Sequence, residues 1–345
     1  MNIAVYCTGD ENAGMGHIMR QLVLADALQK RGHVPYFITR KNTAGEVAIR
    51  RAKEETGSYY ISTYQGDYPP AKLFRTSGAD ITLIDIENGP SRQTLLDAKS
   101  ASLKLVVVGG VGFYISHQTD IDELVDLQIH QTCFVTHEAS AKSKSQYLSG
   151  LDYLILDESF LNARAVRTMR QAEPKKNILI SMGGADPRNL TAHIADSLAR
   201  AFPALHIVAV YGPAAKKASR KIFQSNITIV EAPPQHQLAQ LMSESAFIVT
   251  AMGMTVYEAL CVGVPVCCTA WSKDHEETAL HLERQDALAY LGTWDVFDEG
   301  AMLAFAYNVV SNKEYGERRT KIGYDLVDGE GVNRVVEQLE RLLNG

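Results

Sequence analysis

Strand-like and helix-like segments alternate along the whole chain, and this alternation most constrains the fold. Buried strands are predicted for the apolar runs at residues 2–7, 34–39, 81–86, 104–109 and 126–130, and helices for the patterns at 17–31, 43–56 and 91–101. Strands that alternate with helices are typical of parallel sheets with helices on both faces.

The pattern restarts after a polar segment at residues 171–176, which is typical of an interdomain linker. The strands predicted beyond it are 178–181, 205–210, 227–230, 246–250 and 265–269. A length of 345 residues suits two domains. We therefore expect an α/β fold of two Rossmann-like, doubly wound domains, residues 1–171 and 172–345, facing each other across a cleft. The amphipathic last helix, 332–343, is a candidate to pack back on the first domain.

A glycine-rich turn, Gly14-Met15-Gly16-His17, connects the first strand to the first helix. In an open α/β sheet this turn lies at the carboxyl edge, where ligands bind. Glycine lets the backbone approach a ligand closely, and the helix start offers free N–H groups. The positive end of the helix dipole disfavours a cationic imidazole, so His17 suits a general base. A purely structural histidine remains the alternative, because the third glycine of Gly-x-Gly-x-x-Gly is missing.

Other strands of the first domain also end in residues that could meet a ligand. Asp85 places a carboxylate at the carboxyl end of its strand, at the same edge as His17. Gly109-Gly110-Val111-Gly112 follows the next strand and is either a loop approached by ligand or a simple turn.

Two turns of the second domain predict a nucleotide site. Gly183-Gly184 follows a strand and can bind a diphosphate on bare N–H groups, or simply start a helix in which Asp186 is the cap and Pro187 the first residue. After another strand, Gly253-Met254-Thr255 can place N–H groups against phosphate. Glu258 then either accepts hydrogen bonds from two ribose hydroxyls or closes a capping box with Thr255.

Polar residues open one further predicted helix of the second domain. His275 and Glu276 suit a polyhydroxylated ligand, although a solvated acidic helix start is the alternative. We expect no metal site, since His275 and His281 do not share a helix face.

Composition limits what the chain can bind. A net charge of −6 argues against a general nucleic-acid binder. We expect no transmembrane segment or secretion signal, and five cysteines without a Cys-x-x-Cys pair predict a cytoplasmic protein with reduced thiols.

Three motifs together resemble one enzyme family. Gly14-Met15-Gly16-His17-Ile18-Met19-Arg20, Met182-Gly183-Gly184-Ala185-Asp186-Pro187-Arg188-Asn189 and residues 326–335 are similar to the PseG/SpsG family. Its best-known member hydrolyses UDP-2,4-diacetamido-2,4,6-trideoxy-β-L-altropyranose in pseudaminic acid synthesis. The resemblance implies kinship with the MurG-type GT-B glycosyltransferases, in which the C-terminal domain holds the nucleotide.

The resemblance implies roles for individual residues. His17 matches the catalytic histidine, with Asp85 as its possible carboxylate partner, and Gly183, Gly184 and Glu258 match positions that hold the nucleotide. We assign Gly14, Gly16, Gly253, Met254 and Thr255 to the nucleotide as well, and Arg20, His275 and Glu276 to the sugar. His17 would deprotonate the nucleophile that attacks the anomeric carbon while UDP leaves, with no cofactor required.

The chain departs from the hydrolases of this family around the sugar. It has Asp85-Ile86-Glu87 in place of Asp-x-Tyr, Gly109-Gly110 in place of Asp-Asp, and His275-Glu276 in place of Asn-Gln. On the resemblance we favour a UDP-sugar hydrolase of nonulosonic acid or surface polysaccharide synthesis, and these departures leave the sugar and the acceptor open. A GT-B glycosyltransferase with a sugar, lipid or protein acceptor is the close alternative, and a nucleotide-sugar-binding protein without turnover is the third.

Overall fold

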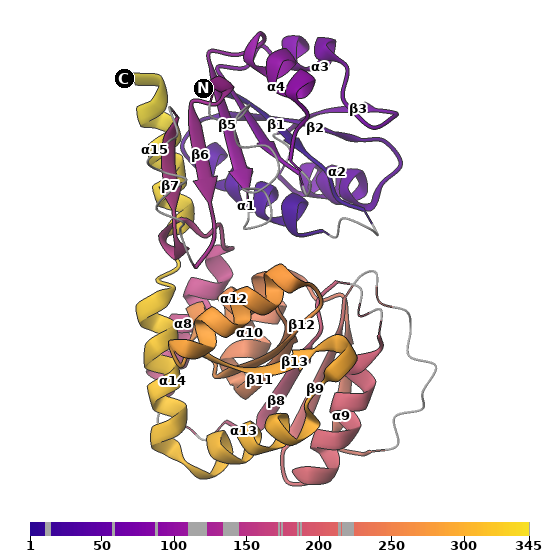
Figure 1. The fold of residues 1–345 in the computed structure, drawn as a ribbon, viewed down its shortest axis with the longest axis vertical. Coiled ribbons are helices and arrows are strands. Elements are labelled where there is room, and N and C mark those ends of the chain that lie inside the picture. Colours follow the sequence, from indigo (N-terminus) through magenta and orange to yellow (C-terminus); the bar gives the residue numbers. More distant parts are fainter. Residues whose placement is uncertain are drawn as a thin grey trace. The chain divides into compact units, whose positions relative to one another are not determined.

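Each half of the chain folds around its own parallel sheet. The computed structural model (Figure 1) describes residues 1–10, 15–56, 59–86, 89–109, 123–133, 145–171, 173, 175–184, 186, 188–212, 215 and 224–344. Two compact units result: Met1–Leu156 with Glu330–Gly345 forms the first, and Asp157–Gly329 forms the second. The expectation of two doubly wound α/β domains is confirmed.

The sheet of the first unit has seven strands, all parallel, in the order β3-β2-β1-β4-β5-β6-β7. The strands are β1 (Asn2–Cys7), β2 (Val34–Arg40), β3 (Tyr60–Tyr64), β4 (Ile81–Asp85), β5 (Lys104–Gly109), β6 (Leu127–His130) and β7 (Gln146–Ser149). The central strands β1, β4 and β5 are buried almost throughout, as expected for a parallel sheet covered on both faces.

Helices cover both faces of this sheet. They are α1 (Gly16–Lys30), α2 (Ala44–Thr56), α3 (Ala71–Thr76), α4 (Arg92–Lys99) and α15 (Gly331–Asn344), with a 3₁₀ turn η1 (Leu151–Tyr153). Alternate residues of each strand point to opposite faces. One face, which includes Ile3, Leu83 and Val108, packs with α1 and α15, and the other, which includes Tyr6 and Ile84, packs with α3 and α4.

The last helix, α15, ends the chain but belongs to the first unit, where it packs against α1 (Figure 1). Its apolar side recurs with helical periodicity at Val335, Val336, Leu339 and Leu342, all in the core cluster of α1. Glu340 adds polar contacts, because Arg31 Nη1 lies 3.1 Å and His33 Nε2 lies 2.9 Å from its carboxylate.

The second unit repeats the architecture with six parallel strands in the order β10-β9-β8-β11-β12-β13. The strands are β8 (Asn177–Ser181), β9 (His206–Tyr211), β10 (Ile227–Glu231), β11 (Ser245–Ala251), β12 (Val266–Ala270) and β13 (Leu288–Thr293). The helices are α8 (Glu158–Met169), α9 (Leu190–Ala201), α10 (Gln235–Glu244), α11 (Met254–Val262), α12 (Lys273–Arg284), α13 (Glu299–Ser311) and α14 (Lys313–Leu326), with a 3₁₀ turn η2 (Trp294–Val296).

The division between the units comes at residue 157, before the expected linker at 171–176. Helix α8 lies between the two positions and packs on α10 and α11, which makes it part of the second unit. Arg167 anchors it: its guanidinium donates to the carbonyls of Ser243, Ser245 and Gly263 at 2.7–3.1 Å. The expected boundary of 172 is therefore wrong by one helix.

Strand order places both glycine-rich turns where ligands bind in open α/β sheets. The sheet order reverses at β1, which lies between β2 and β4, and again at β8, which lies between β9 and β11. Ligands of doubly wound sheets bind outside the carboxyl ends of the strands at such a reversal. His17 follows β1 and Asp85 ends β4, whereas Gly183 and Gly253 follow β8 and β11.

We expect Gly331→Ala to destabilise the first unit. A Cβ at Gly331 would lie 2.1 Å from the carbonyl oxygen of Leu154, which is backbone and cannot move aside. Overpacking of this kind costs about 1–3 kcal/mol. Thermal unfolding followed by circular dichroism should show a lower midpoint.

Gly316→Ala is the matched control, because a Cβ there meets nothing closer than 3.9 Å inside α14. It should raise stability slightly through helix propensity. Equal midpoints for the Gly331→Ala protein and the unmodified chain would contradict the packing assigned to α15.

Candidate functional site

His17 enters the first unit's site from the start of α1. The helix begins at Gly16, and its N-cap residue, Met15, provides no side-chain hydrogen bond to the free N–H groups. The His17 side chain remains 19% exposed, and a Cβ placed on Gly16 would meet no atom within 4 Å. Among the described residues, no side chain caps the positive end of this helix, where the partly exposed imidazole lies.

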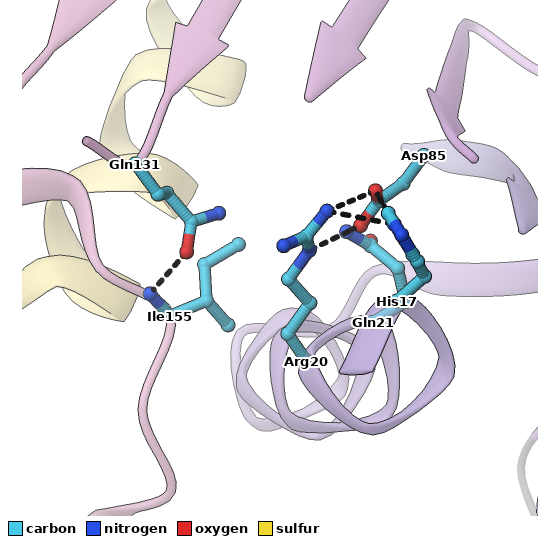
Figure 2. A network of polar contacts seen from close by, with 6 residues as sticks. All are labelled: His17, Arg20, Gln21, Asp85, Gln131 and Ile155. Atoms are coloured by element: carbon cyan, nitrogen blue, oxygen red, sulfur yellow. Dashed lines mark hydrogen bonds and ion pairs between the residues drawn. The ribbon is translucent and has the colours of Figure 1, made fainter. Parts of the chain in front are cut away.

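Asp85 gathers three side chains from a single face of α1 (Figure 2). The carboxylate is fully buried at the end of β4. His17 Nδ1 lies 2.7 Å from Oδ1, while Arg20 Nε and Gln21 Nε2 donate to Oδ2 at 2.5 and 2.7 Å. Residues at i, i+3 and i+4 lie on the same face of a helix, which is why one carboxylate can reach all three.

The charge of Asp85 is maintained by Arg20. Burial alone would raise the pKa of this carboxyl, but the guanidinium of Arg20 and the His17 ring outweigh burial and hold the pKa well below its usual range. An ionised carboxylate accepts hydrogen bonds only, so the 2.7 Å contact with Asp85 requires the proton on His17 Nδ1, whereas Arg20 Nη2, a donor 2.9 Å from the same nitrogen, opposes that tautomer. The lone pair of Nε2 is then free to take a proton from a nucleophile.

Arg20, which we expect at the sugar, belongs to the same polar network as His17. Its Nε and Nη2 atoms are both bound to Asp85, Nη2 also lies 2.9 Å from His17 Nδ1, and Nη1 has no partner among the described residues. Gln21 was not predicted, although it is fully buried and holds the same carboxylate. The spacing of His17, Arg20 and Gln21 on one predicted helix was the signal that could have found it.

Gly14 and the segment after β5 lie outside the described residues. The structure therefore says nothing of Gly14, Glu87 or residues 110–112, on which part of the sequence analysis rested. Gly109 is described and closes β5.

In the second unit, the backbone is closely packed where β8 and β9 end. Gly183 adopts a φ of 84°, a conformation that favours glycine, and neither it nor Gly184 would bring a Cβ within 4 Å of another residue. A Cβ on Gly212, by contrast, would lie 2.4 Å from the Gly183 carbonyl oxygen. Gly212 is thus a second glycine that this turn requires, and the sequence analysis missed it.

The start of α9 already carries a negative charge. Asp186 accepts hydrogen bonds from the backbone N–H groups of Leu190 and Thr191 at 2.9 and 3.0 Å. The helix begins at Leu190 with Asn189 as its N-cap residue, three residues later than expected for Pro187 as the first helical position. Because a carboxylate occupies these N–H groups, the first turn of α9 is not available to a diphosphate.

The start of α11 is different, because no side chain in the described part of the chain caps it. The N-cap residue is Gly253, with no side-chain hydrogen bond, and the helix begins at Met254. Thr255 therefore lies inside the first turn, and the capping-box interpretation of Thr255 and Glu258 is wrong. The uncapped N–H groups leave this helix start able to bind an anion.

Glu258 is buried one turn into α11, with 7% of its surface exposed. Burial raises the pKa of this carboxyl to about 7, although a hydrogen bond from the Thr255 hydroxyl opposes the shift. A buried carboxyl with a single neighbouring hydroxyl as hydrogen-bond donor retains capacity to accept further hydrogen bonds.

The start of α12 lies after β12, the strand next to β11. Ser272 caps it by accepting from the His275 backbone N–H, and its Oγ lies 2.7 Å from His275 Nδ1. Trp271, which is 53% exposed, stacks on the His275 ring with 4.5 Å between centroids. Glu276 accepts a 3.0 Å hydrogen bond from Tyr290. Both predicted sugar residues are thus held by neighbours of their own unit.

Metal binding, cysteine chemistry and membrane insertion can be judged from the described residues. Within the described ranges, no group of three His, Cys, Asp or Glu side chains is placed to hold a metal. None of the five cysteines, all within the described ranges, forms a disulfide, and burial raises the pKa of the Cys7 thiol. No helix in the described part of the chain has the length and apolar character needed to cross a membrane.

We expect Asp85→Asn to destabilise the first unit strongly at neutral pH, because Arg20 would be left buried without its counter-charge. Breaking one partner of a buried pair costs about 3–5 kcal/mol. Because the folded-state pKa of Asp85 is depressed, its contribution is complete above the unfolded-state pKa of about 3.9 and is lost at lower pH. Urea unfolding at several pH values should show the difference shrinking in acid.

Asp295→Asn is the matched control for this loss of charge. Its carboxylate pairs with Arg188 on the surface, where the two side chains are 72% and 58% exposed. Such a pair contributes at most about 1 kcal/mol. A similar loss of unfolding free energy in both variants would show that burial of Asp85 against Arg20 adds no more stability than a surface ion pair.

Comparison with protein families finds one match, confined to the second unit. The model of the family described as UDP-glucoronosyl and UDP-glucosyl transferase matches residues 168–322. This range contains both glycine-rich turns of the second sheet as well as Glu258.

Individual proteins match over the whole chain. The spore coat polysaccharide biosynthesis protein SpsG of Bacillus subtilis is 24% identical over 99% of this chain and 98% of its own length. Among solved structures, MurG of Acinetobacter baumannii superposes with a TM-score of 0.64 at 13% identity, covering 99% of this chain and 100% of that one. UDP-GlcNAc 2-epimerase of Neisseria meningitidis, bound to UDP-GlcNAc, also gives 0.64, at 14% identity over 98% and 100%. The expected resemblance to the PseG/SpsG family and the GT-B-like fold are thereby confirmed.

Proposed function

We propose that this protein acts at the anomeric carbon of a UDP-sugar, releases UDP, and serves polysaccharide biosynthesis. The single observation that carries the proposal is the His17–Asp85 pair at the reversal of the first sheet. The name of the SpsG relative supports the biosynthetic setting, and the family match over the second unit supports a UDP-sugar as the substrate. Five cysteines of which none forms a disulfide suit a reducing compartment, so we propose that the reaction is cytoplasmic.

The second unit holds the nucleotide in this proposal. The uncapped start of α11 binds phosphate oxygens on the N–H groups of Met254 and Thr255, where the helix dipole favours negative charge. Glu258, one turn further, accepts hydrogen bonds from the ribose hydroxyls. The backbone at Gly183 and Gly184 lets the ligand approach closely at a second place in this unit, because no other residue lies within 4 Å of either Cβ position.

The first unit supplies the base. His17 Nε2 takes the proton of the nucleophile. At the same time the oxygen of the nucleophile forms a bond to the anomeric carbon, and the bond between that carbon and UDP breaks. Asp85 remains ionised and stabilises the imidazolium that forms, without taking the proton itself. The uncapped N–H groups of α11 stabilise the charge of the departing diphosphate.

Hydrolysis and glycosyl transfer use this arrangement equally well, since His17 can deprotonate water or a hydroxyl. We favour a hydrolase because the likeness that covers the entire chain is to the PseG/SpsG family. The transferase alternative is supported by the family model that matches the second unit, whose description names transferases. The two differ in whether product forms before an acceptor is added.

We expect His17→Ala to lose roughly 10²–10⁴-fold in turnover, the usual contribution of a general base, while UDP affinity stays unchanged. A panel of UDP- and CMP-sugars, with and without cell extract as acceptor source, should be followed by mass spectrometry. UDP and free sugar formed from the nucleotide sugar alone indicate a hydrolase, and product formed only with extract indicates a transferase.

His193→Ala is the control, because this histidine is 45% exposed and pairs with Glu299 on the second unit. It should retain activity. A fully active His17→Ala protein, or the absence of turnover under every condition, would contradict the catalytic proposal.

We also expect UDP affinity to fall as the pH drops through 7. Glu258 has its pKa raised to about 7 by burial, so it loses its charge below that pH and becomes a weaker acceptor for ribose hydroxyls. The loss should be roughly tenfold between pH 8 and pH 5.5, the equivalent of about 1.4 kcal/mol. Titration calorimetry measures it.

Glu258→Gln separates this effect from the titration of the phosphates themselves. The variant should bind UDP with a smaller pH dependence. It should also be more stable than the parent protein at pH 8, because a carboxyl with a raised pKa loses stability as the pH rises above its unfolded-state value. If UDP affinity depended on pH in the same way in the two proteins, the assignment of Glu258 to the ribose site would be wrong.

A further inference from the structure

A cavity beside the end of α8, the α8 cavity, carries more cationic than acidic side chains. Its volume is about 220 Å³, and it lies between the end of α8, the residues that lead into β8 and the end of α10. Four cationic and two acidic side chains line it, which gives a net charge of +2. They are Arg167, Arg170, Lys175, Lys176, Glu173 and Glu244.

The α8 cavity lies at the opposite end of β8 from the glycine-rich turn. Asn177 lines the cavity and begins the strand, whereas Gly183 follows the strand's other end. Extended chain over that interval spans roughly 20 Å. A ligand in the α8 cavity would therefore not compete with one held at the carboxyl edge of the same sheet.

Arg167 brings a buried charge to the cavity without a carboxylate to balance it. Only 8% of the residue is exposed, and its Nε and Nη1 atoms donate to backbone carbonyls. Its Nη2 atom has no hydrogen-bond partner among the described residues. Burial lowers the pKa of this guanidinium to about 10, which leaves it charged at neutral pH. Two N–H hydrogens of a buried cation thus remain for an acceptor.

Two further cations lie close to this guanidinium. Lys175 Nζ donates to the backbone carbonyl of Arg170 at 3.1 Å, which holds the ammonium at the end of α8. Burial and the charge of Arg167 lower the pKa of Lys175, and Arg170 acts in the same direction. The carboxylates of Glu173 and Glu244 oppose this shift without cancelling it. An anion bound among the three cations would relieve their mutual repulsion.

We propose that the α8 cavity binds a phosphate group, held by Arg167, Arg170 and Lys175. The site is separate from the one assigned to the UDP-sugar, so it adds a second ligand to the protein. The shared chemistry of the ligand is a phosphate dianion, either a soluble ion or the headgroup of a lipid.

A phosphate group matches the cavity in charge and in size. Near neutral pH a phosphomonoester carries a charge of about −1.5 to −2, which balances the net charge of the lining side chains. Its oxygens can accept hydrogen bonds from guanidinium and ammonium groups at the same time. A single carboxylate would leave half of that charge unbalanced. A water molecule takes up about 30 Å³, so the cavity has room for the five heavy atoms of a phosphate group.

Titration calorimetry of the full chain with inorganic phosphate tests the site. Saturating UDP is included, because UDP keeps phosphate away from the start of α11 in the proposed function. The parent protein should bind one phosphate. The double variant Arg170→Gln with Lys175→Gln should bind it about tenfold more weakly or worse, because two charge-assisted contacts are lost.

Two further double variants separate a site from a general effect of charge. Arg200→Gln with Lys313→Gln removes the same two charges from exposed ion pairs on α9 and α14, outside the cavity, and should bind phosphate like the parent. Arg170→Lys with Lys175→Arg keeps both charges in the cavity and should also bind phosphate.

Sedimentation with phosphatidylcholine vesicles, with and without phosphatidic acid, distinguishes the two sources of phosphate. Binding of inorganic phosphate assigns a soluble ion. Binding only to vesicles with phosphatidic acid, lost in the glutamine variant of the cavity, assigns a lipid headgroup.

The inference is overturned if the parent binds neither inorganic phosphate nor these vesicles. It is also overturned if the glutamine variant of the cavity binds as tightly as the parent, or if the control on α9 and α14 loses as much affinity. A protein that binds phosphate as expected but does not bind UDP would uphold this site and overturn the proposed function.

Discussion

The arrangement of the first unit depends on one buried carboxylate. Asp85 is removed from water at the end of β4, and it can stay ionised there only because Arg20 lies against it. That requirement brings one turn of α1 to the strand end and orients His17 at the same time. Stability and chemistry are therefore coupled, because the pair that prevents an uncompensated buried charge also contacts the imidazole at Nδ1.

The second unit distinguishes its helix starts by how they are capped. Asp186 binds the first N–H groups of α9, and Ser272 binds those of α12, whereas α11 has no side-chain cap. Three helices that follow strands of one sheet would otherwise offer similar anion sites. Side-chain capping thus leaves one helix start open to a phosphate, beside the buried carboxyl of Glu258.

Pattern alone predicted most of the fold, and it was wrong where packing decides. Ten of the strands were located because central parallel strands are continuous apolar runs. The strands β3, β7 and β13 were missed because their residues are largely only partly buried and their sequence is mixed. The assignment of α8 to the second unit depends on carbonyls that accept hydrogen bonds from Arg167, which no periodicity reveals.

The sequence by itself determined the two doubly wound sheets, the glycine-rich turns at their carboxyl edges and the candidates His17, Asp85 and Glu258, because these follow from local periodicity and residue type. Only the tertiary structure decided which groups pair. It assigned Arg20 and Gln21 to Asp85 and gave Asp186 to the start of α9. Such pairings join residues brought together by strand order and helix rotation, and a side chain's partner depends on that geometry rather than on its place in the chain.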